Sequence, residues 1–440
     1  MWACSSPMRQ NGAVLMALLM LTSLLAGSSL LAQSVQQARL YQQHKTRSAL
    51  AAAQQALLSY AVDLSPGSCT GNCPRPGDLP CPDLDDDGIA ELSCGNAAGS
   101  QQSRRLGRLP WRTLGLDDLR DGSGERLWYA VSNRYKNSTR AFPLNADTAG
   151  TITLYQQHGY RLYDANLAQG LVAVILAPGA ALQRMDGLQQ QRDSLHSNDP
   201  SHYLDSNRHD DNASFVDGSN DGFVMAEPSS HFNDALALIT QPQIQQRMQQ
   251  RVAMEVSRAL LDYFCGMGNS DHVASSCLGT GGVRYLPDAA AFNDSSCTGT
   301  GSLAAGLCLA VTDQGRIAAH GLSPAWDSNS LLRGSSVNNW FQQNGWRNQI
   351  YYARAPACGA TSPDCSGSGG LLNLSNASRL PQDNKMAVVI AAGPALLNQS
   401  RTSMLSLDAY LEGENALPDQ HFERRRLSAS DFNDLVSSLP

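Results

Sequence analysis

The sequence predicts an α+β fold in which one long N-terminal helix begins in a membrane and two similar units follow, each a helix packed on an antiparallel sheet. Three observations lead to this prediction. An uncharged apolar segment covers residues 13–32, the chain continues from it to Ser65 without a proline, and short segments recur in the same order roughly two hundred residues later. We therefore divide the chain into residues 1–12, 13–32, 33–240 and 241–440.

The membrane segment, residues 13–32, carries no charge and consists mainly of Leu, Met, Val and Ala. Twenty residues at about 1.5 Å rise per residue cover roughly 30 Å, the thickness of the hydrocarbon core of a bilayer. Its backbone must be helical, because lipid cannot satisfy polar groups. A cleaved signal peptide is an alternative, although a cut after Ala32 would put Leu30 where a small residue is preferred. An uncleaved signal anchor is another.

The helix is expected to continue beyond the membrane. Residues 33–65 contain neither glycine nor proline, and Leu50, Ala53, Leu57 and Ala61 form an apolar stripe at helical spacing. The proline and glycine directly after this stretch end the helix. One helix of about fifty residues would thus lie half in lipid and half against a globular head.

The segment from Arg9 to Leu31 resembles the N-terminus of type IV pilins and of the pseudopilins of type II secretion systems. It has a short leader with a basic residue, Gly12 at the cleavage position and an apolar helix that runs on into an amphipathic half. The resemblance implies that a prepilin peptidase removes residues 1–12 and methylates the new N-terminus at Ala13. It also implies a single-pass protein of the bacterial inner membrane, whose periplasmic head joins other pilins or pseudopilins through the helix.

Two positions depart from the family pattern. The first residue after the cleavage is usually Phe or Met and here is Ala13, and the fifth is usually Glu and here is Ala17. In the family this Glu is thought to pair with the N-terminus of the neighbouring subunit, and its absence is known among minor subunits at a filament tip. Because an unpartnered carboxylate in lipid is costly, its absence fits a subunit with no neighbour above it.

The cysteines indicate an oxidising compartment. The chain has 11, and removal of the leader with Cys4 would leave an even number. The rest fall into neighbouring pairs in loops rich in Gly, Ser and Pro, which favours local disulfides over zinc, because no Cys-x-x-Cys pair is present. Sequence alone does not fix a connectivity. The predicted pairs are Cys69 with Cys73, Cys81 with Cys94, Cys265 with Cys277, Cys297 with Cys308, and Cys358 with Cys365.

The chain after the first helix is predicted to form strands and then a second helix. Residues 184–231 are polar and predicted to form a loop, and residues 232–240 a short helix or strand. Residues 243–264 lack glycine and proline and carry apolar side chains near one face, which predicts an amphipathic helix. Strands are predicted where aromatic and β-branched residues gather, at residues 126–131, 151–155, 159–163 and 171–176.

The second helix begins a repeat of the first half. The matches are short, but they come in the same order in both halves, and their offsets differ only as loop insertions would make them differ. A helix followed by antiparallel strands is also the pilin layout, so both units resemble pilin heads. The matching segments are 56–60 with 259–263, 127–130 with 350–353, 173–177 with 387–391, and 232–234 with 432–434.

A calcium site is predicted in the acidic segment 83–91. Carboxylates at its first, third and fifth positions and Gly88 at its sixth form the first half of a calcium-binding loop. The usual Glu at position twelve is replaced by Cys94, whose disulfide with Cys81 would preorganise the loop. A solvated acidic turn is the alternative. The predicted ligands are Asp83, Asp85, Asp87, Glu91 and the backbone carbonyl of Ile89.

No other motif points to chemistry. The acidic stretch 210–227, with His202 and His209 nearby, has irregular spacing and is predicted to be a surface loop. Residues 321–325 lack the final glycine of a nucleophile elbow, and no metalloprotease or phosphate-binding motif occurs. A net charge of −7 argues against a nucleic-acid partner. We expect no enzymatic activity.

The expected function is that of a pilin-like minor subunit, at the tip of a type IV pilus or of a type II secretion pseudopilus. A bulky head repeated along a shaft would crowd its neighbours, which favours the tip. One alternative is a surface adhesin or binding module with a pilin-like anchor. Another is an anchored periplasmic enzyme, which would need a deep polar pocket in one of the two units.

Overall fold

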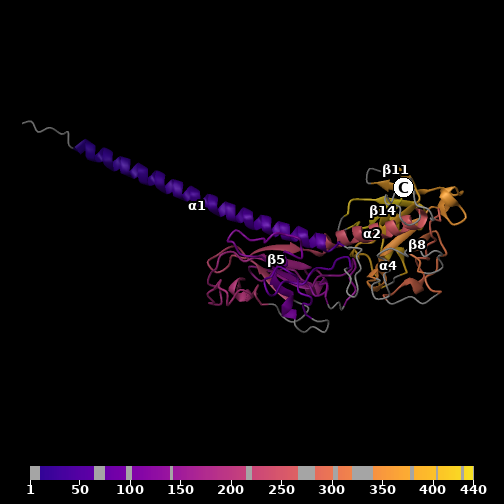
Figure 1. Cartoon of the computed structure of the whole chain (residues 1–440). Helices are drawn as coiled ribbons and strands as arrows, with labels where there is room; N and C mark the ends of the chain where they lie inside the picture. The colour runs from indigo at the N-terminus through magenta and orange to yellow at the C-terminus, as the bar shows by residue number, and fades with distance from the viewer. Residues whose placement is uncertain are drawn as a thin grey trace, which may run out of the picture.

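The structure, a computed structural model, contains one long helix and two units that follow each other along the chain (Figure 1). The N-terminal part of the helix projects away from the rest, and the second unit lies at the end farthest from it. The structure describes residues 10–63, 75–95, 102–138, 142–214, 221–265, 283–300, 306–319, 340–376, 381–402, 405–427 and 431–439.

The long helix is α1 (Gln10–Tyr60), with 51 residues. It begins before the predicted membrane segment and ends five residues short of the predicted end. The described side chains of residues 14–44 are exposed, whereas Leu50, Ala53 and Leu57 are buried against the first unit. The predicted apolar stripe is therefore confirmed. Among the described helices, α1 is the one long and apolar enough to cross a membrane.

The first unit has three layers: the C-terminal part of α1, a four-stranded antiparallel sheet and a smaller sheet. Side chains alternate along β2 and β5, so that Tyr129 and Ile175 pack on the α1 side while Trp128 and Val174 pack on the small sheet. The four-stranded sheet has the order β1 (Leu106–Arg108), β2 (Trp128–Val131), β5 (Ala173–Ala177), β7 (Ala235–Ile239). The small sheet has the order β4 (Arg161–Tyr163), β3 (Ile152–Gln156), β6 (Asp221–Met225).

The second unit has the same arrangement. Its helix α2 (Gln241–Cys265) packs on β12 and β14, as α1 packs on β5 and β7. Its four-stranded sheet has the order β8 (Gln314–Arg316), β9 (Ile350–Arg354), β12 (Ala387–Ala391), β14 (Leu435–Leu439). Its small sheet has the order β11 (Pro381–Lys385), β10 (Leu372–Asn376), β13 (His421–Arg424). Two short helices, α3 (Trp340–Gln343) and α4 (Trp346–Gln349), precede β9.

Short 3-10 turns connect these elements. Two of them occupy equivalent places, directly before the Tyr-Leu-acidic segments at Tyr203 and Tyr410. The 3-10 turns are η1 (Gln102–Arg105), η2 (Ala165–Leu167), η3 (Pro200–His202), η5 (Ser295–Cys297), η6 (Pro356–Cys358), η7 (Pro363–Cys365), η8 (Leu407–Ala409) and η9 (Gly413–Ala416).

One part of the strand prediction was wrong. Residues 184–231 were expected to form a loop, but β6 lies within them and pairs in parallel with β3. Phe223 and Val224 of this strand are fully buried. The strand is too short to stand out within a polar segment, and its parallel partner lies about seventy residues earlier. The predicted strands at β2, β3, β4 and β5, and the helix α2, are confirmed.

The two units repeat each other in side-chain contacts as well as in topology. The Tyr129 hydroxyl donates to the carbonyl of Pro80 over 3.2 Å, and the Tyr352 hydroxyl donates to the carbonyl of Pro287 over 3.0 Å. Each of these prolines belongs to the Leu-Pro turn that follows its unit's helix. The equivalent contacts explain why the Leu-Pro and aromatic segments recur in the sequence.

Each unit contains a pair of buried carboxyl groups that accept hydrogen bonds from each other's backbone N–H groups. In the second unit, Glu412 Oε2 accepts the backbone N–H groups of Asn433 and Asp434, and Asp434 Oδ2 accepts the N–H of Glu412. In the first unit, Asp205 and Asp234 make the same reciprocal bonds. The repeated Phe-Asn-Asp segment therefore supplies one carboxyl group of each buried pair, and the Tyr-Leu-acidic segment supplies the other. The pair joins the two segments.

The units contact each other through a loop of the first unit, at Asp147. Its carboxylate accepts two bonds from one Arg401 nitrogen at 2.8 and 2.7 Å, one from Gln349 Nε2 at 2.7 Å, and one from the N–H of Ala395 at 3.1 Å. All three donors belong to the second unit. A single apolar core also includes residues of both units. We refer to Asp147 and these three donors as the clamp.

Gly122 marks the closest approach between α1 and the first unit. Its N–H donates to Thr46 Oγ1 over 2.9 Å, and a Cβ at this position would lie 2.2 Å from the backbone oxygen of Gln42. Gly122→Val should therefore separate the helix from the sheet and lower the free energy of unfolding by about 1–3 kcal/mol. Thermal unfolding checks this, with the exposed neighbour Ser123→Val as the control. Equal stability of the two variants would contradict this packing.

Candidate membrane helix and metal site

The apolar half of α1 has the surface that a membrane helix needs. All described large hydrophobic side chains from Val14 to Leu30 are more than half exposed. The hydroxyls of Thr22, Ser23, Ser28 and Ser29 donate to backbone carbonyls three residues earlier, at 2.8–3.0 Å. A hydroxyl satisfied within its own helix does not require water. This half of the helix is therefore suited to lipid or to other apolar helices.

The predicted processing site lies within α1. Gly12 and Ala13 fall inside the bounds of the helix, and the side chain of Ala13 lies outside the described part of the chain. Ala17, the position at which the pilin family usually has Glu, is exposed. No charged residue occurs between residues 13 and 32 to interrupt the apolar surface.

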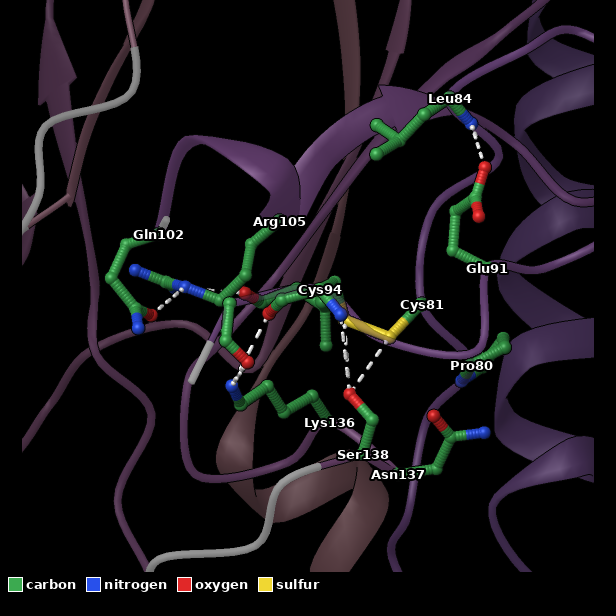
Figure 2. The surroundings of a disulfide bond; sticks show 12 residues. Pro80, Cys81, Leu84, Glu91, Cys94, Gln102, Arg105, Lys136, Asn137 and Ser138 are labelled. Atoms are coloured by element: carbon green, nitrogen blue, oxygen red, sulfur yellow. Dashed lines mark hydrogen bonds between the residues drawn. A yellow bond between two sulfur atoms is a disulfide. The ribbon is translucent and has the colours of Figure 1, made fainter. Parts of the chain in front are cut away.

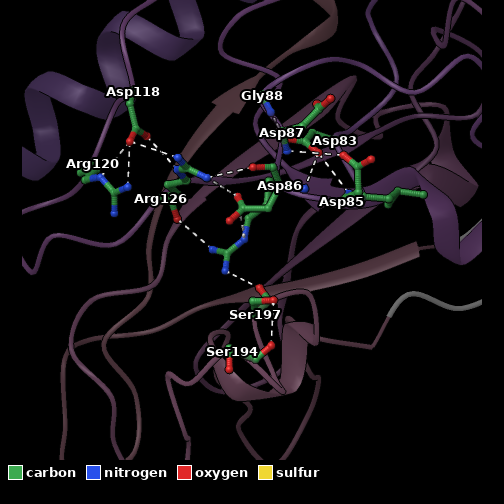
Figure 3. Close-up of polar contacts among 12 residues, drawn as sticks. Asp83, Asp85, Asp86, Asp87, Gly88, Asp118, Arg120, Arg126, Ser194 and Ser197 are labelled. Carbon is green, nitrogen blue, oxygen red and sulfur yellow. Dashed lines mark hydrogen bonds and ion pairs between the residues drawn. The ribbon is translucent and has the colours of Figure 1, made fainter.

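The acidic loop is organised around the buried carboxylate of Asp83 (Figure 3). Its Oδ1 accepts the N–H groups of Asp85 at 3.1 Å and Asp86 at 2.7 Å, and its Oδ2 accepts the N–H of Gly88 at 2.6 Å. Gly88 has a φ of +86°, and a Cβ there would lie 2.6 Å from the ring of Trp111. Only glycine fits this turn, which explains the acidic-then-glycine pattern.

Three carboxylates gather at this loop. One oxygen from each of Asp83, Asp85 and Glu91 lies within 4.8 Å of the others. Glu91 is held by the N–H of Leu84, which donates to its Oε1 over 3.3 Å. Burial raises the pKa of Asp83, and the neighbouring Asp85 carboxyl raises it further. A hard cation such as Ca²⁺ takes carboxylate oxygens and would relieve the repulsion between these groups.

Other members of the predicted ligand set lie apart from this group. Asp87 Oδ1 accepts the N–H of Ile89 over 2.7 Å, and its carboxylate is not one of the gathered three. The predicted contribution of the Ile89 carbonyl stays a prediction. Asp86 instead pairs with Arg126 at 2.8 Å, and Arg126 also pairs with Asp118 at 2.9 Å (Figure 3). The arginine therefore compensates the charge of Asp86, which is not one of the three gathered carboxylates.

The acidic group is not required by the fold. In the first unit, residue 83 forms a backbone bridge with Arg108, and in the second unit the equivalent bridge joins Ala290 to Arg316. The second unit thus builds the same bridge with alanine in place of Asp83. The carboxylates are an addition of the first unit, which favours a ligand-binding role over a purely structural turn.

Disulfides hold the loops next to these elements. Figure 2 shows Cys81 bonded to Cys94, with an S–S distance of 2.03 Å and Ser138 Oγ 3.1 Å from the Cys81 sulfur. Lys136 Nζ donates to the carbonyl of Cys94, and burial lowers the pKa of this lysine to about 8. Since Cys94 is in a disulfide, it cannot serve as the twelfth-position ligand.

Two other predicted pairs are also bonded in the structure. They are Cys297 with Cys308 and Cys358 with Cys365. Cys265 is disulfide-bonded. Its predicted partner Cys277, and the pair Cys69 and Cys73, lie outside the described residues. Neighbouring cysteines close short loops here, as the sequence predicts.

Among the described residues, the second acidic stretch forms no metal-binding group, and neither His202 nor His209 joins one. Asp211 instead pairs with the buried Arg184 at 2.6 Å. Sequence analysis did not identify the buried carboxyl pairs. The Phe-Asn-Asp segments that recur at residues 232–234 and 432–434 were the available signal.

We compared the chain with protein-family models, with curated proteins and with solved structures, and none of the three comparisons gave a match.

If the acidic loop binds Ca²⁺, the ion should stabilise the folded chain. Ca²⁺ at a concentration a hundredfold above its Kd should add about 2.7 kcal/mol to the free energy of unfolding. Asp85→Asn should remove most of this gain, whereas the equally exposed Asp87→Asn should retain it, because Asp87 is outside the gathered group. Thermal unfolding in Ca²⁺ and in EDTA measures the difference. No Ca²⁺ effect on the unaltered chain would exclude the site.

Proposed function

We propose that this chain is a membrane-anchored, pilin-like minor subunit, located at the tip of a type IV pilus or of a type II secretion pseudopilus. The observation that carries the proposal is α1, a continuous helix whose apolar half is exposed and whose C-terminal half is packed on a head. An exposed apolar helix of this length is stable only in lipid or among other apolar helices. Other pilins or pseudopilins are thus the expected partners.

We further infer that the two units arose by duplication of one pilin-like head. The equivalent strand orders, the parallel strand added to each small sheet and the reciprocal carboxyl pairs support this inference. The second unit lies far from the N-terminal end of α1 (Figure 1), and among its described residues no helix is apolar enough to span a membrane. A head doubled in this way suits the end of a filament, where no subunit stacks above it.

N-terminal processing tests the proposal. Intact mass and N-terminal sequencing of protein from its native membrane should show a chain that starts at methylated Ala13. Gly12→Leu should block this cut, and Ala32→Leu should leave it unchanged. A start near Gln33 that Ala32→Leu abolishes would identify an ordinary signal peptide, and the anchor with its pilin function would be excluded.

The position in the filament needs a second measurement. Gold-labelled antibody against the head should mark filament ends in electron micrographs of sheared filaments. Labelling at regular intervals along the shaft would contradict a tip position, because it would make the chain a repeating subunit.

A further inference from the structure

A cleft of about 970 Å³ lies between the two units. From the first unit it is lined by β4, through Leu162 and Tyr163, and by Leu167 of η2. From the second unit it is lined by Leu396 and Leu397. Its volume is at the upper end of the range for small-molecule sites. The clamp residues Asp147 and Arg401 lie at its edge.

The polar part of the lining consists mainly of neutral amides. Residues 241–249 of α2 contribute four glutamines, and Gln169, which follows β4, is a fifth. The two charged residues in the lining, Asp147 and Arg401, neutralise each other at 2.7 Å. A charged ligand would therefore find no free counter-charge. An amide side chain can both donate and accept, which matches the hydroxyl group, a donor and acceptor in one atom.

Two of these amides have fixed orientations and lack a partner for their oxygen. Gln245 is 1% exposed, its Nε2 donates to the carbonyls of Ala146 and Thr148, and its Oε1 is buried without a hydrogen bond. Asn433 is 8% exposed, its Nδ2 donates to the carbonyl of Pro394 over 2.7 Å, and its Oδ1 also has no partner. Both oxygens are closed off from solvent, so these two amides form fixed parts of the wall, and the exposed amides of Gln169 and Gln246 are the ones that a ligand can reach.

The apolar side chains of the lining offer contacts to the apolar parts of a ligand. Leu167 is 67% exposed and Leu397 is fully exposed, on opposite sides of the cleft. Apolar side chains on both walls of a cleft offer a ligand apolar surface that it can cover. The carbon-bound hydrogens of a sugar ring form an apolar face of the kind that leucine and Tyr163 accommodate.

We propose that this cleft binds a neutral oligosaccharide, with its hydroxyls on the amides of α2 and its ring faces on the leucines. The ligand would contact both units at once and would hold them in their present arrangement. This proposal does not require the filament function, since an anchored adhesin would use the same cleft. A neutral peptide is the competing ligand, because β4 is an edge strand of its sheet.

The test is a binding measurement on the full chain in a detergent without a sugar headgroup. Maltohexaose, cellohexaose and chitohexaose are the neutral probes, with hexameric hyaluronan and a neutral Ser/Gly hexapeptide as the comparators, all at millimolar concentration in saturation-transfer NMR. We expect at least one neutral oligosaccharide to bind, and the hyaluronan and the peptide not to bind.

Matched variants place the binding in the cleft. Gln246 and Gln250 are both exposed on α2, but only Gln246 lines the cleft. Gln246→Ala should therefore weaken binding at least about tenfold, and Gln250→Ala should leave it unchanged. Leu167→Arg should likewise weaken binding. Leu195→Arg, at an exposed position outside the cleft, should leave binding unchanged. Equal affinities within either matched pair, or no bound neutral oligosaccharide, would overturn the proposal. Binding of the peptide alone would replace it with a peptide site.

Discussion

Asp434→Ala is expected to lower the free energy of unfolding by about 3–5 kcal/mol, the largest effect we predict for a single carboxyl group. Asp434 is 1% exposed and belongs to the buried carboxyl pair of the second unit. Its Oδ2 accepts the N–H of Glu412 at 2.9 Å and Asn415 Nδ2 at 3.2 Å. Alanine would leave both donors buried without a partner, at about 1–3 kcal/mol each, and would add a small cavity.

The same residue should make stability depend on pH. Burial, and then the nearby Glu412 carboxylate, raise the pKa of Asp434 well above its ordinary value of 3.8. The folded chain therefore keeps a proton that the unfolded chain has already lost. The stabilisation is complete below about pH 3.8 and is lost as the pH rises through the folded pKa. Burial followed by the charge of Asp205 raises the pKa of Asp234 in the same way.

Asp434→Asn separates the two effects. It keeps the shape and an acceptor oxygen but cannot ionise, so it should cost less than alanine and should flatten the decline of stability between weakly acidic and alkaline pH. Urea unfolding at a series of pH values measures this, and Asp234→Asn repeats the test in the first unit. A decline equally steep in the unaltered chain and in the double Asn variant would show that these pairs do not hold protons.

Asp147→Ala is expected to lower the free energy of unfolding by about 2–3 kcal/mol and to loosen the contact between the two units. It removes every bond of the clamp and leaves Arg401, whose side chain is 11% exposed, without its carboxylate. Removing one partner of a fully buried ion pair costs about 3–5 kcal/mol. Because the Asp147 side chain is 37% exposed, we expect a smaller loss.

Limited proteolysis and small-angle X-ray scattering measure the contact between the units. The variant should be cleaved faster near the start of α2 and should have a larger radius of gyration than the unaltered chain. Asp164→Ala is the matched control, because Asp164 pairs with Arg161 at a similar distance but within the first unit. An unchanged radius of gyration for Asp147→Ala would show that the clamp is not needed to join the units, and that the shared apolar core and the hydrogen bonds of Asn344 to the first unit suffice.

The sequence predicted the elements that depend on local pattern. An uncharged apolar run, a stripe at helical spacing and the absence of proline specify α1, and the same spacing specifies α2. Strands β2 and β5 follow from dense aromatic and aliphatic residues. Cysteines close in sequence are near enough to bond without help from distant contacts, so the pairs Cys81–Cys94, Cys297–Cys308 and Cys358–Cys365 could be anticipated.

The candidate metal site was predicted in part. The acidic pattern predicted the position of the loop, because the turn around Asp83 is made by residues that follow it directly in the sequence. Which carboxylates converge was decided by the path of the chain beyond the turn, which brings Glu91 to Asp83 and turns Asp87 away. The pairing of Asp86 with Arg126, forty residues later, removes another carboxylate from the set.

The sequence by itself determined the long apolar helix, the recurrence of segments in two units and the position of the acidic loop, because each is carried by neighbouring residues or by a repeated order of segments. Only the tertiary structure decided how β6 pairs with β3, how the carboxyl pairs close each unit, and how Asp147 joins the units beside a cleft. These features bring together residues that are far apart in the chain. No local pattern specifies such contacts, because their free energy comes from burial and pairing that exist only once the chain has folded.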